Sequence, residues 1–127
     1  MILPNIETFI GCESSFEEAS IVLYGAPFDS TTSFRPGARF GPSVMRHESF
    51  GLETYSPYQD RDLMDIRAFD SGDLELCFGS SEMALSDIEK RAEEILNAGK
   101  FPLLLGGEHL VTLAAVRAAA AKYPDLH

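Results

Sequence analysis

Basic residues and cysteines are scarce in this chain of 127 residues. Ten lysines and arginines stand against 20 aspartates and glutamates, which gives a formal net charge of −10. Nucleic-acid binding depends on clustered lysine and arginine, so this balance argues against a nucleic-acid partner. The two cysteines, Cys12 and Cys77, have neither CxxC spacing nor a disulfide-dense context, which favours a reducing cytoplasm.

Long apolar runs are also missing. No segment approaches the roughly 20 apolar residues that a membrane-spanning helix needs. The first residues, MILPNIETFIGCESSFEE, have no basic n-region and no long apolar stretch, so they do not resemble a secretory signal. With 45% hydrophobic and 24% charged residues, the composition predicts one soluble globular domain without a membrane partner.

Short apolar runs bounded by turn residues predict three β-strands, over residues 20–27, 66–75 and 101–107. The second run is the weakest, and we expect it to break at residues 71–73. Because these runs are continuous rather than alternating, they are typical of strands that are buried on both faces of a parallel sheet.

Three helical segments separate or follow these strands, over residues 41–52, 81–100 and 109–122. The middle helix has an apolar stripe formed by Met83, Leu85, Ile88, Ala92, Ile95 and Leu96. Gly99 is expected to cap it, and Pro124 to close the last helix, which is so rich in Ala, Leu and Val that we expect it to be largely buried. Alternating strands and helices predict an α/β fold with a parallel sheet.

The sequence Gly106-Gly107-Glu108-His109 follows the third predicted strand, and three interpretations of it stay open. It can be a tight strand-to-helix turn in which His109 caps or packs. A phosphate-binding loop is the second interpretation, although Glu108 would repel an anion and the third glycine of G-x-G-x-x-G is missing. A metal site is the third, but one histidine is too few, because a catalytic metal needs three or more protein ligands.

Two other sets of residues fall near predicted strand ends. Asp29, Asp70 and Asp73 are carboxylates at or after those ends, but nothing in the local sequence brings them together. The loop that follows the first strand contains Arg35, Arg39 and Arg46 and is punctuated by Arg-Pro-Gly and Gly-Pro, so its shape should be fixed. It is placed to form the rim of a site, although each arginine can equally pair with a nearby acid.

Three stretches together resemble one family. The stretches GAPFDSTTSFRPGARFGPSVMR, FDSGDL and GGEH are similar to the amino-terminal half of the ureohydrolases, the arginase and agmatinase superfamily. The Arg-Pro-Gly-x-Arg-x-Gly-Pro pattern resembles agmatinases in particular, and GLETYSPYQDRDL resembles those of Gram-positive bacteria. The resemblance extends over essentially the whole chain.

This resemblance implies a fold and an activity. Members are three-layer α/β/α proteins with an eight-stranded, mainly parallel sheet and a binuclear Mn²⁺ centre, and the complete enzymes form homo-oligomers, trimers or hexamers. The family agmatinase acts on a small cationic guanidino substrate, agmatine, and releases urea and putrescine, a step of polyamine biosynthesis. Two metals can generate a nucleophile at neutral pH strong enough for a guanidinium carbon.

Carried over residue by residue, the resemblance implies one metal ligand, His109, and no other catalytic or cofactor-binding residue. Glu108 stands where members have Glu or Asp, and we expect it to support a ligand or to begin the helix. The family's remaining ligands lie in a later Asp-x-His-x-Asp stretch and a still later Asp-x-Asp, and neither follows His109 here. His127 precedes that region and is not assigned to metal.

We therefore interpret residues 1–127 as the amino-terminal portion of a single ureohydrolase domain, truncated before the Asp-x-His-x-Asp motif, with only the first three strands. In isolation the chain is expected to be inactive. Two alternatives stay open: an amidinohydrolase acting on another guanidino substrate, such as a guanidinobutyrase, and a non-catalytic truncated remnant.

Overall fold

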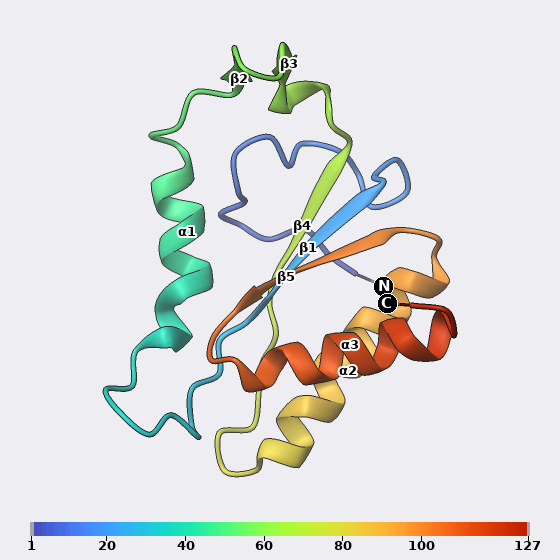
Figure 1. Cartoon of the computed structure of the whole chain (residues 1–127). Coiled ribbons are helices and arrows are strands. Elements are labelled where there is room, and N and C mark those ends of the chain that lie inside the picture. The colour runs from blue at the N-terminus through green and yellow to red at the C-terminus, as the bar shows by residue number, and fades with distance from the viewer. Residues whose placement is uncertain (1, 127) are drawn as a thin grey trace.

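A three-stranded sheet lies at the centre of the computed structural model, which describes residues 2–126 (Figure 1). Its strands are β1 (Ile21–Ala26), β4 (Ala68–Asp73) and β5 (Phe101–Gly106), and β1 lies between the other two. Both pairings are parallel, as the sequence predicted. The carboxyl ends of all three strands therefore lie at one edge of the sheet, where ligands bind in folds of this class.

Strand β4 continues through residues 71–73, so the predicted break there is wrong. Leu23 of β1 lies opposite Asp70 of β4, and Gly25 lies opposite Asp73. Over this step the chain advances two residues in β1 but three in β4. Gly72 has a φ of 74°, which glycine adopts without strain, and it accommodates the extra residue. The glycine that suggested an interruption instead forms a bulge within the strand.

Helices cover both faces of the sheet, which confirms the three-layer architecture. Helices α2 (Ser81–Asn97) and α3 (Leu110–Lys122) pack on each other and on one face, while α1 (Gly41–Ser49) lies on the other (Figure 1). Helix α1 begins with the predicted Gly-Pro pair, in which proline loses no needed hydrogen-bond donor. Short 3₁₀ helices, η1 (Ala38–Phe40) and η2 (Leu63–Asp65), lie in the connections.

The main core lies between the sheet and α2. Alternate residues of β1, Val22, Tyr24 and Ala26, face this core and are fully buried. On α2, the buried residues are Ala84, Ile88, Ala92, Ile95 and Leu96. The predicted stripe is therefore confirmed except at its start, where Met83 is 57% exposed and Ala84 faces the core in its place. Gly99, with a φ of 74°, ends α2 as predicted.

Helix α3 is less buried than predicted. Only Val111, Ala114 and Ala118 are buried, while Leu113 and Val116 are 42% and 50% exposed. The physical reason is that only one stripe of α3 packs against α2 and the sheet. The opposite side of α3 has no neighbour among the described residues. Strand β5 is likewise not buried on both faces, since Phe101 and Leu103 are 64% and 42% exposed.

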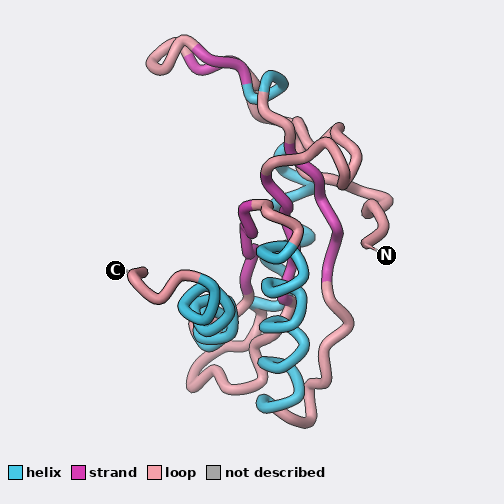
Figure 2. The backbone as a smooth tube through the Cα atoms, turned by 90° about the vertical axis from the view of Figure 1, so that its right-hand side faces the viewer, coloured by secondary structure: helices cyan, strands magenta, loops and turns pink. Residues whose placement is uncertain are grey.

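A small hairpin of β2 (Tyr55–Ser56) and β3 (Arg61–Asp62) stands out from the rest of the molecule, as the side view shows (Figure 2). Its tip residue Tyr58 is fully exposed. Within residues 2–126, no helix is both long enough and apolar enough to cross a membrane.

Candidate metal-ligand site

The turn after β5 brings His109 to the carboxyl edge of the sheet. β5 ends at Gly106, and His109 is the residue directly before α3, with an exposed side chain. Gly107 has a φ of 40°, and a Cβ there would lie 2.5 Å from the carbonyl oxygen of Ala26 and 2.6 Å from that of Phe28. No side chain fits in this space, which explains why the turn needs glycine.

Glu108 turns away from the solvent and towards the loop after β1. Its backbone N–H donates to the carbonyl oxygen of Phe28 at 2.8 Å. Its carboxylate accepts hydrogen bonds from the backbone N–H of Thr31, at 3.2 Å, and from the Thr31 hydroxyl. Helix α3 begins two residues later, and no side chain caps it. The Glu108 carboxylate therefore does not cap the start of the helix, which was one of the two roles expected for this residue.

A cavity of about 310 Å³ opens beside His109. Its walls are Thr31, Thr32, Ser33, Phe34, Glu108, His109 and Leu110. Three consecutive residues that carry hydroxyl groups, residues 31–33, thus line the same cavity as His109. The His109 imidazole makes no hydrogen bond to any residue of the described range. Such an imidazole, exposed and uncommitted, fits one position of a metal coordination sphere.

The loop after β1 is held in shape by Asp29, which is 1% exposed. The Asp29 carboxylate accepts from the backbone N–H groups of Gly37 and Arg39, at 2.6 and 3.1 Å, and forms an ion pair with the Arg39 guanidinium at 2.6 Å. The Arg39 guanidinium is the main cause that lowers the pKa of Asp29; burial opposes it and the two backbone bonds add to it. The fixed shape predicted for this loop follows from these contacts.

Asp70 and Asp73 both bind Arg46, which is 2% exposed. Nε and Nη2 of Arg46 donate to the two carboxylate oxygens of Asp70 at 2.8 and 3.0 Å, and Nη1 donates to Asp73 at 2.5 Å. Burial lowers the pKa of the guanidinium, but the hydrogen bonds that it donates to the two carboxylates outweigh this effect, and the pKa is raised. Arg35 differs, because its guanidinium lies over the Phe34 ring, 5.2 Å from the centroid.

The strand-end carboxylates therefore do not join His109. Asp29 is committed to Arg39, and Asp70 and Asp73 to Arg46. Among residues 2–126 no group of three or more His, Cys, Asp and Glu side chains is placed to hold a metal ion. His109 can thus supply one ligand of a centre but not the centre itself, and His127 lies outside the described residues.

The sequence did not predict that Thr31, Thr32 and Ser33 line the cavity beside His109. These residues are separated from Glu108 by up to 77 positions, and no local pattern indicates that they meet. The available signal is the run of hydroxyl residues directly after a strand's carboxyl end, at the place where α/β folds bind ligands.

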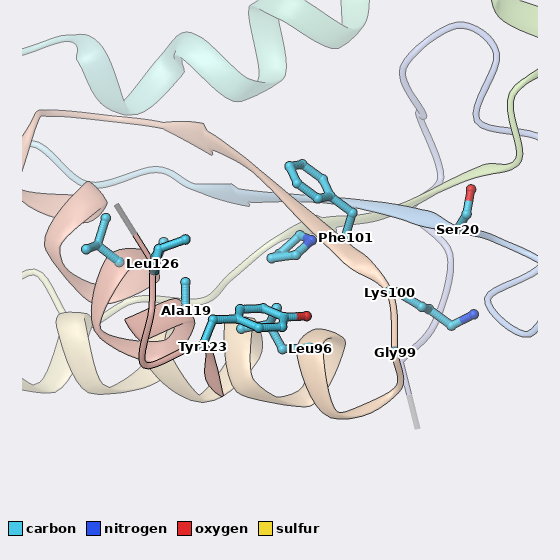
Figure 3. A pocket seen from close by; sticks show the side chains of 11 residues that line it. Ser20, Leu96, Gly99, Lys100, Phe101, Ala119, Tyr123 and Leu126 are labelled. Carbon is cyan, nitrogen blue, oxygen red and sulfur yellow. The ribbon is translucent and has the colours of Figure 1, made fainter. Parts of the chain in front are cut away.

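A larger cavity, of about 480 Å³, lies between α3 and the start of β5 (Figure 3). Figure 3 shows Leu96, Phe101, Ala119, Tyr123 and Leu126 around it, and most of its lining is apolar. It lies near the amino-terminal end of β5, beside Lys100, whereas His109 follows the carboxyl end. His109 does not line this cavity. We therefore do not assign the cavity to the candidate metal-ligand site.

Comparisons with known proteins show which sequences this chain is similar to. The family model described as "Arginase family" matches residues 19–127. The agmatinase of Bacillus subtilis is 52% identical over 120 residues, which cover 94% of this chain and 41% of that protein. The chain therefore spans about two fifths of the length of the curated relatives it matches.

Solved structures have the same fold. A crystal structure of a Clostridium difficile protein matches with a TM-score of 0.84 and 50% identity, covering 87% of this chain and 40% of that one. The crystal structure of Trypanosoma cruzi formiminoglutamase with Mn²⁺ matches with a TM-score of 0.76 and 26% identity, covering 87% and 38%.

Proposed function

The chain belongs to the arginase family, and on that basis we propose that it forms the amino-terminal part of an agmatinase-type ureohydrolase. The proposed reaction is hydrolysis of the guanidino group of agmatine to putrescine and urea. The observation that carries the proposal is the exposed, uncommitted imidazole of His109 at the carboxyl edge of a parallel sheet. The 52% identity to an agmatinase over 120 residues supports agmatine as the proposed substrate.

The proposed metal is Mn²⁺, in a binuclear centre to which His109 contributes one ligand. A relative of the same fold contains Mn²⁺. That ion prefers carboxylate oxygens, so His109 is proposed as a nitrogen ligand in a centre whose other ligands are mainly carboxylates. When bound, the ions lower the pKa of water and so provide a nucleophile for the guanidinium carbon. The chain's own contribution is the turn that carries the His109 imidazole. Gly106, Gly107 and Glu108 form this turn, which packs against the loop after β1.

The remaining ligands would come from sheet strands beyond β5. Within residues 2–126, β5 pairs only with β1, and Phe101 and Leu103 leave apolar surface next to its outer edge. Val116 of α3 is 50% exposed and lines the same cavity as Phe101. We propose that a further strand of a longer domain pairs with β5 here and buries these side chains, and that residues 1–127 are the amino-terminal portion of that domain.

The proposed substrate is a small guanidino cation. The net charge of −10 favours attraction of such a cation. The proposed location is the cytoplasm, since Cys12 and Cys77 are both unpaired. We propose that the complete enzyme forms a homo-oligomer, either a trimer or a hexamer, and we make no such proposal for the isolated chain.

A chimera tests the proposal. The matching segment of the Bacillus subtilis agmatinase is replaced by this chain, and urea release is measured with Mn²⁺ from agmatine and from guanidinobutyrate. We expect urea from agmatine, and none from the isolated chain. A folded, Mn²⁺-loaded chimera that releases no urea would support the remnant interpretation, and release from guanidinobutyrate alone would support the guanidinobutyrase alternative.

A further inference from the structure

Glu108 is a buried carboxylate beside an exposed histidine. It is 9% exposed, and none of the ion pairs among residues 2–126 includes it. Burying a charge without a counter-ion is unfavourable unless strong hydrogen bonds replace its hydration. Both of its side-chain hydrogen bonds come from one residue, Thr31, through the backbone N–H and the hydroxyl.

These two bonds join segments that are 77 residues apart in the sequence. Hydrogen bonds to an ionised acceptor are about twice as strong as those between neutral groups. Glu108 accepts with both oxygens, so it fixes Thr31 in orientation as well as in position. The contact thus connects the turn that presents His109 to the loop that faces it.

The loop is also anchored by Asp29, which precedes residues 31–34. Asp29 accepts from Gly37 and Arg39, and Thr32 donates its hydroxyl to the Asp29 carbonyl oxygen at 3.0 Å. Phe34 is 77% exposed. Among residues 2–126, the Glu108 backbone N–H joins the turn to the base of the loop at Phe28, and the side-chain bonds between the turn and the wall at residues 31–34 come from Thr31.

We propose that Glu108 is a positioning residue that fixes residues 31–34 as the substrate-side wall of the cavity beside His109. Through its bonds to Thr31, the wall and the metal-ligand turn keep one relative position. A small guanidino cation then meets hydroxyl oxygens and the Phe34 ring at a fixed separation from the imidazole. This proposal rests on the proposed function for the identity of the ligand, but the contact itself needs neither metal nor substrate.

Amide hydrogen exchange of the metal-free chain tests the contact. Thr31→Val removes the hydroxyl donor, Thr31→Ser keeps both donors, and Glu108→Leu removes the acceptor. Loss of hydrogen bonds to a charged group should accelerate exchange within residues 31–34, at the hydrogen-bonded amides of Thr31 and Thr32, by about tenfold to a hundredfold in Thr31→Val and Glu108→Leu. Thr31→Ser should exchange like the wild type, and so should the control Glu93→Gln, which changes an exposed acid on α2.

A purely structural role predicts a different pattern. Exchange would then rise in equal proportion at residues 31–34 and at Val22 in the core, and either this result or unchanged exchange at 31–34 would overturn the proposal. Because Thr31 is exposed, Thr31→Val should fold even if Glu108→Leu does not.

In the chimera, Thr31→Val should raise KM for agmatine more than it lowers kcat. An equal effect on both parameters, or none on KM, would contradict a positioning role. If the unsubstituted chimera releases no urea while the exchange result holds, the proposed function fails and the contact stands.

Discussion

The Arg46 guanidinium binds both carboxylate oxygens of Asp70 in the interior, at 2.8 and 3.0 Å. The side chains are 2% and 0% exposed, so this bidentate pair is almost fully removed from water. It ties α1 to β4 across one face of the sheet, and it withdraws a strand-end carboxylate from any role as a metal ligand. The candidate site therefore relies on His109 and on the loop opposite it.

Removing Arg46 should strongly destabilise the fold. Arg46→Ala leaves the buried Asp70 carboxylate without its counter-ion, although the backbone N–H groups of Phe9 and Gly72 still donate to it. Loss of one partner of a buried ion pair typically costs about 3–5 kcal/mol of unfolding free energy. The measurement is urea denaturation at neutral pH. The matched control is Lys90→Ala, which breaks an exposed ion pair to Asp87 and should change stability by less than about 1 kcal/mol. Equal effects of the two substitutions would refute a structural role for the buried pair.

Asp29 should make stability depend on acid pH. Its pKa in the folded chain is lowered below the ordinary value of 3.8, mainly by Arg39, so ionised Asp29 stabilises the folded state above about pH 4. That stabilisation is lost as the pH falls through the lowered pKa. The stability difference between the wild type and Asp29→Asn should be constant from pH 7 to about 4 and shrink below that. A difference that does not change between pH 7 and 2 would count against the predicted linkage.

Tyr24 should be replaceable by phenylalanine with a gain in stability. Its hydroxyl is buried and has no hydrogen-bond partner among the described residues, and burial raises its pKa to about 12. Removing an unsatisfied buried group in Tyr24→Phe should stabilise the fold by about 1 kcal/mol.

Alkaline pH separates this effect from simple repacking. The wild type should lose further stability as the pH rises from about 10 to 12, because the folded state resists ionisation of Tyr24, whereas Tyr24→Phe should lack that part of the loss. Tyr58→Phe, at a fully exposed position, is the control and should match the wild type throughout. A destabilised Tyr24→Phe would indicate a hidden partner for the hydroxyl.

The outer edge of β5 should drive self-association of the isolated chain. Leu103 is 42% exposed beside a strand edge that lacks a second partner within residues 2–126, and such edges pair with other chains. Leu103→Lys should shift the chain towards monomer in sedimentation velocity at rising concentration. Leu52→Lys is the control, because Leu52 is 58% exposed but distant in sequence from the sheet. Association that is equally reduced by both substitutions would argue against the edge as the contact.

The local sequence was sufficient to predict the three strands of the parallel sheet and most of the α2 stripe, because apolar runs and glycine placement act over short distances. It did not predict the short hairpin of β2 and β3. It failed at Gly72, where a bulge and an interruption share one signal. It also overestimated the burial of α3, since apolar composition does not say which neighbours are present. The local sequence could not predict the contact between Glu108 and Thr31, because a hydrogen bond between residues 77 positions apart leaves no local pattern.

Metal analysis of the His109→Ala chimera is the sharpest test of the proposal that His109 is a metal ligand. Manganese content, melting temperature and urea release are measured on the same sample, with His47→Ala, another exposed histidine, as the control. Even indirect changes near a metal cost roughly 10–100-fold in affinity or activity, so loss of a direct ligand should cost at least that. We predict reduced Mn²⁺ and suppressed urea release in His109→Ala with an unchanged melting temperature. Full Mn²⁺ content with normal turnover, or a lowered melting temperature with both intact, would contradict the assignment.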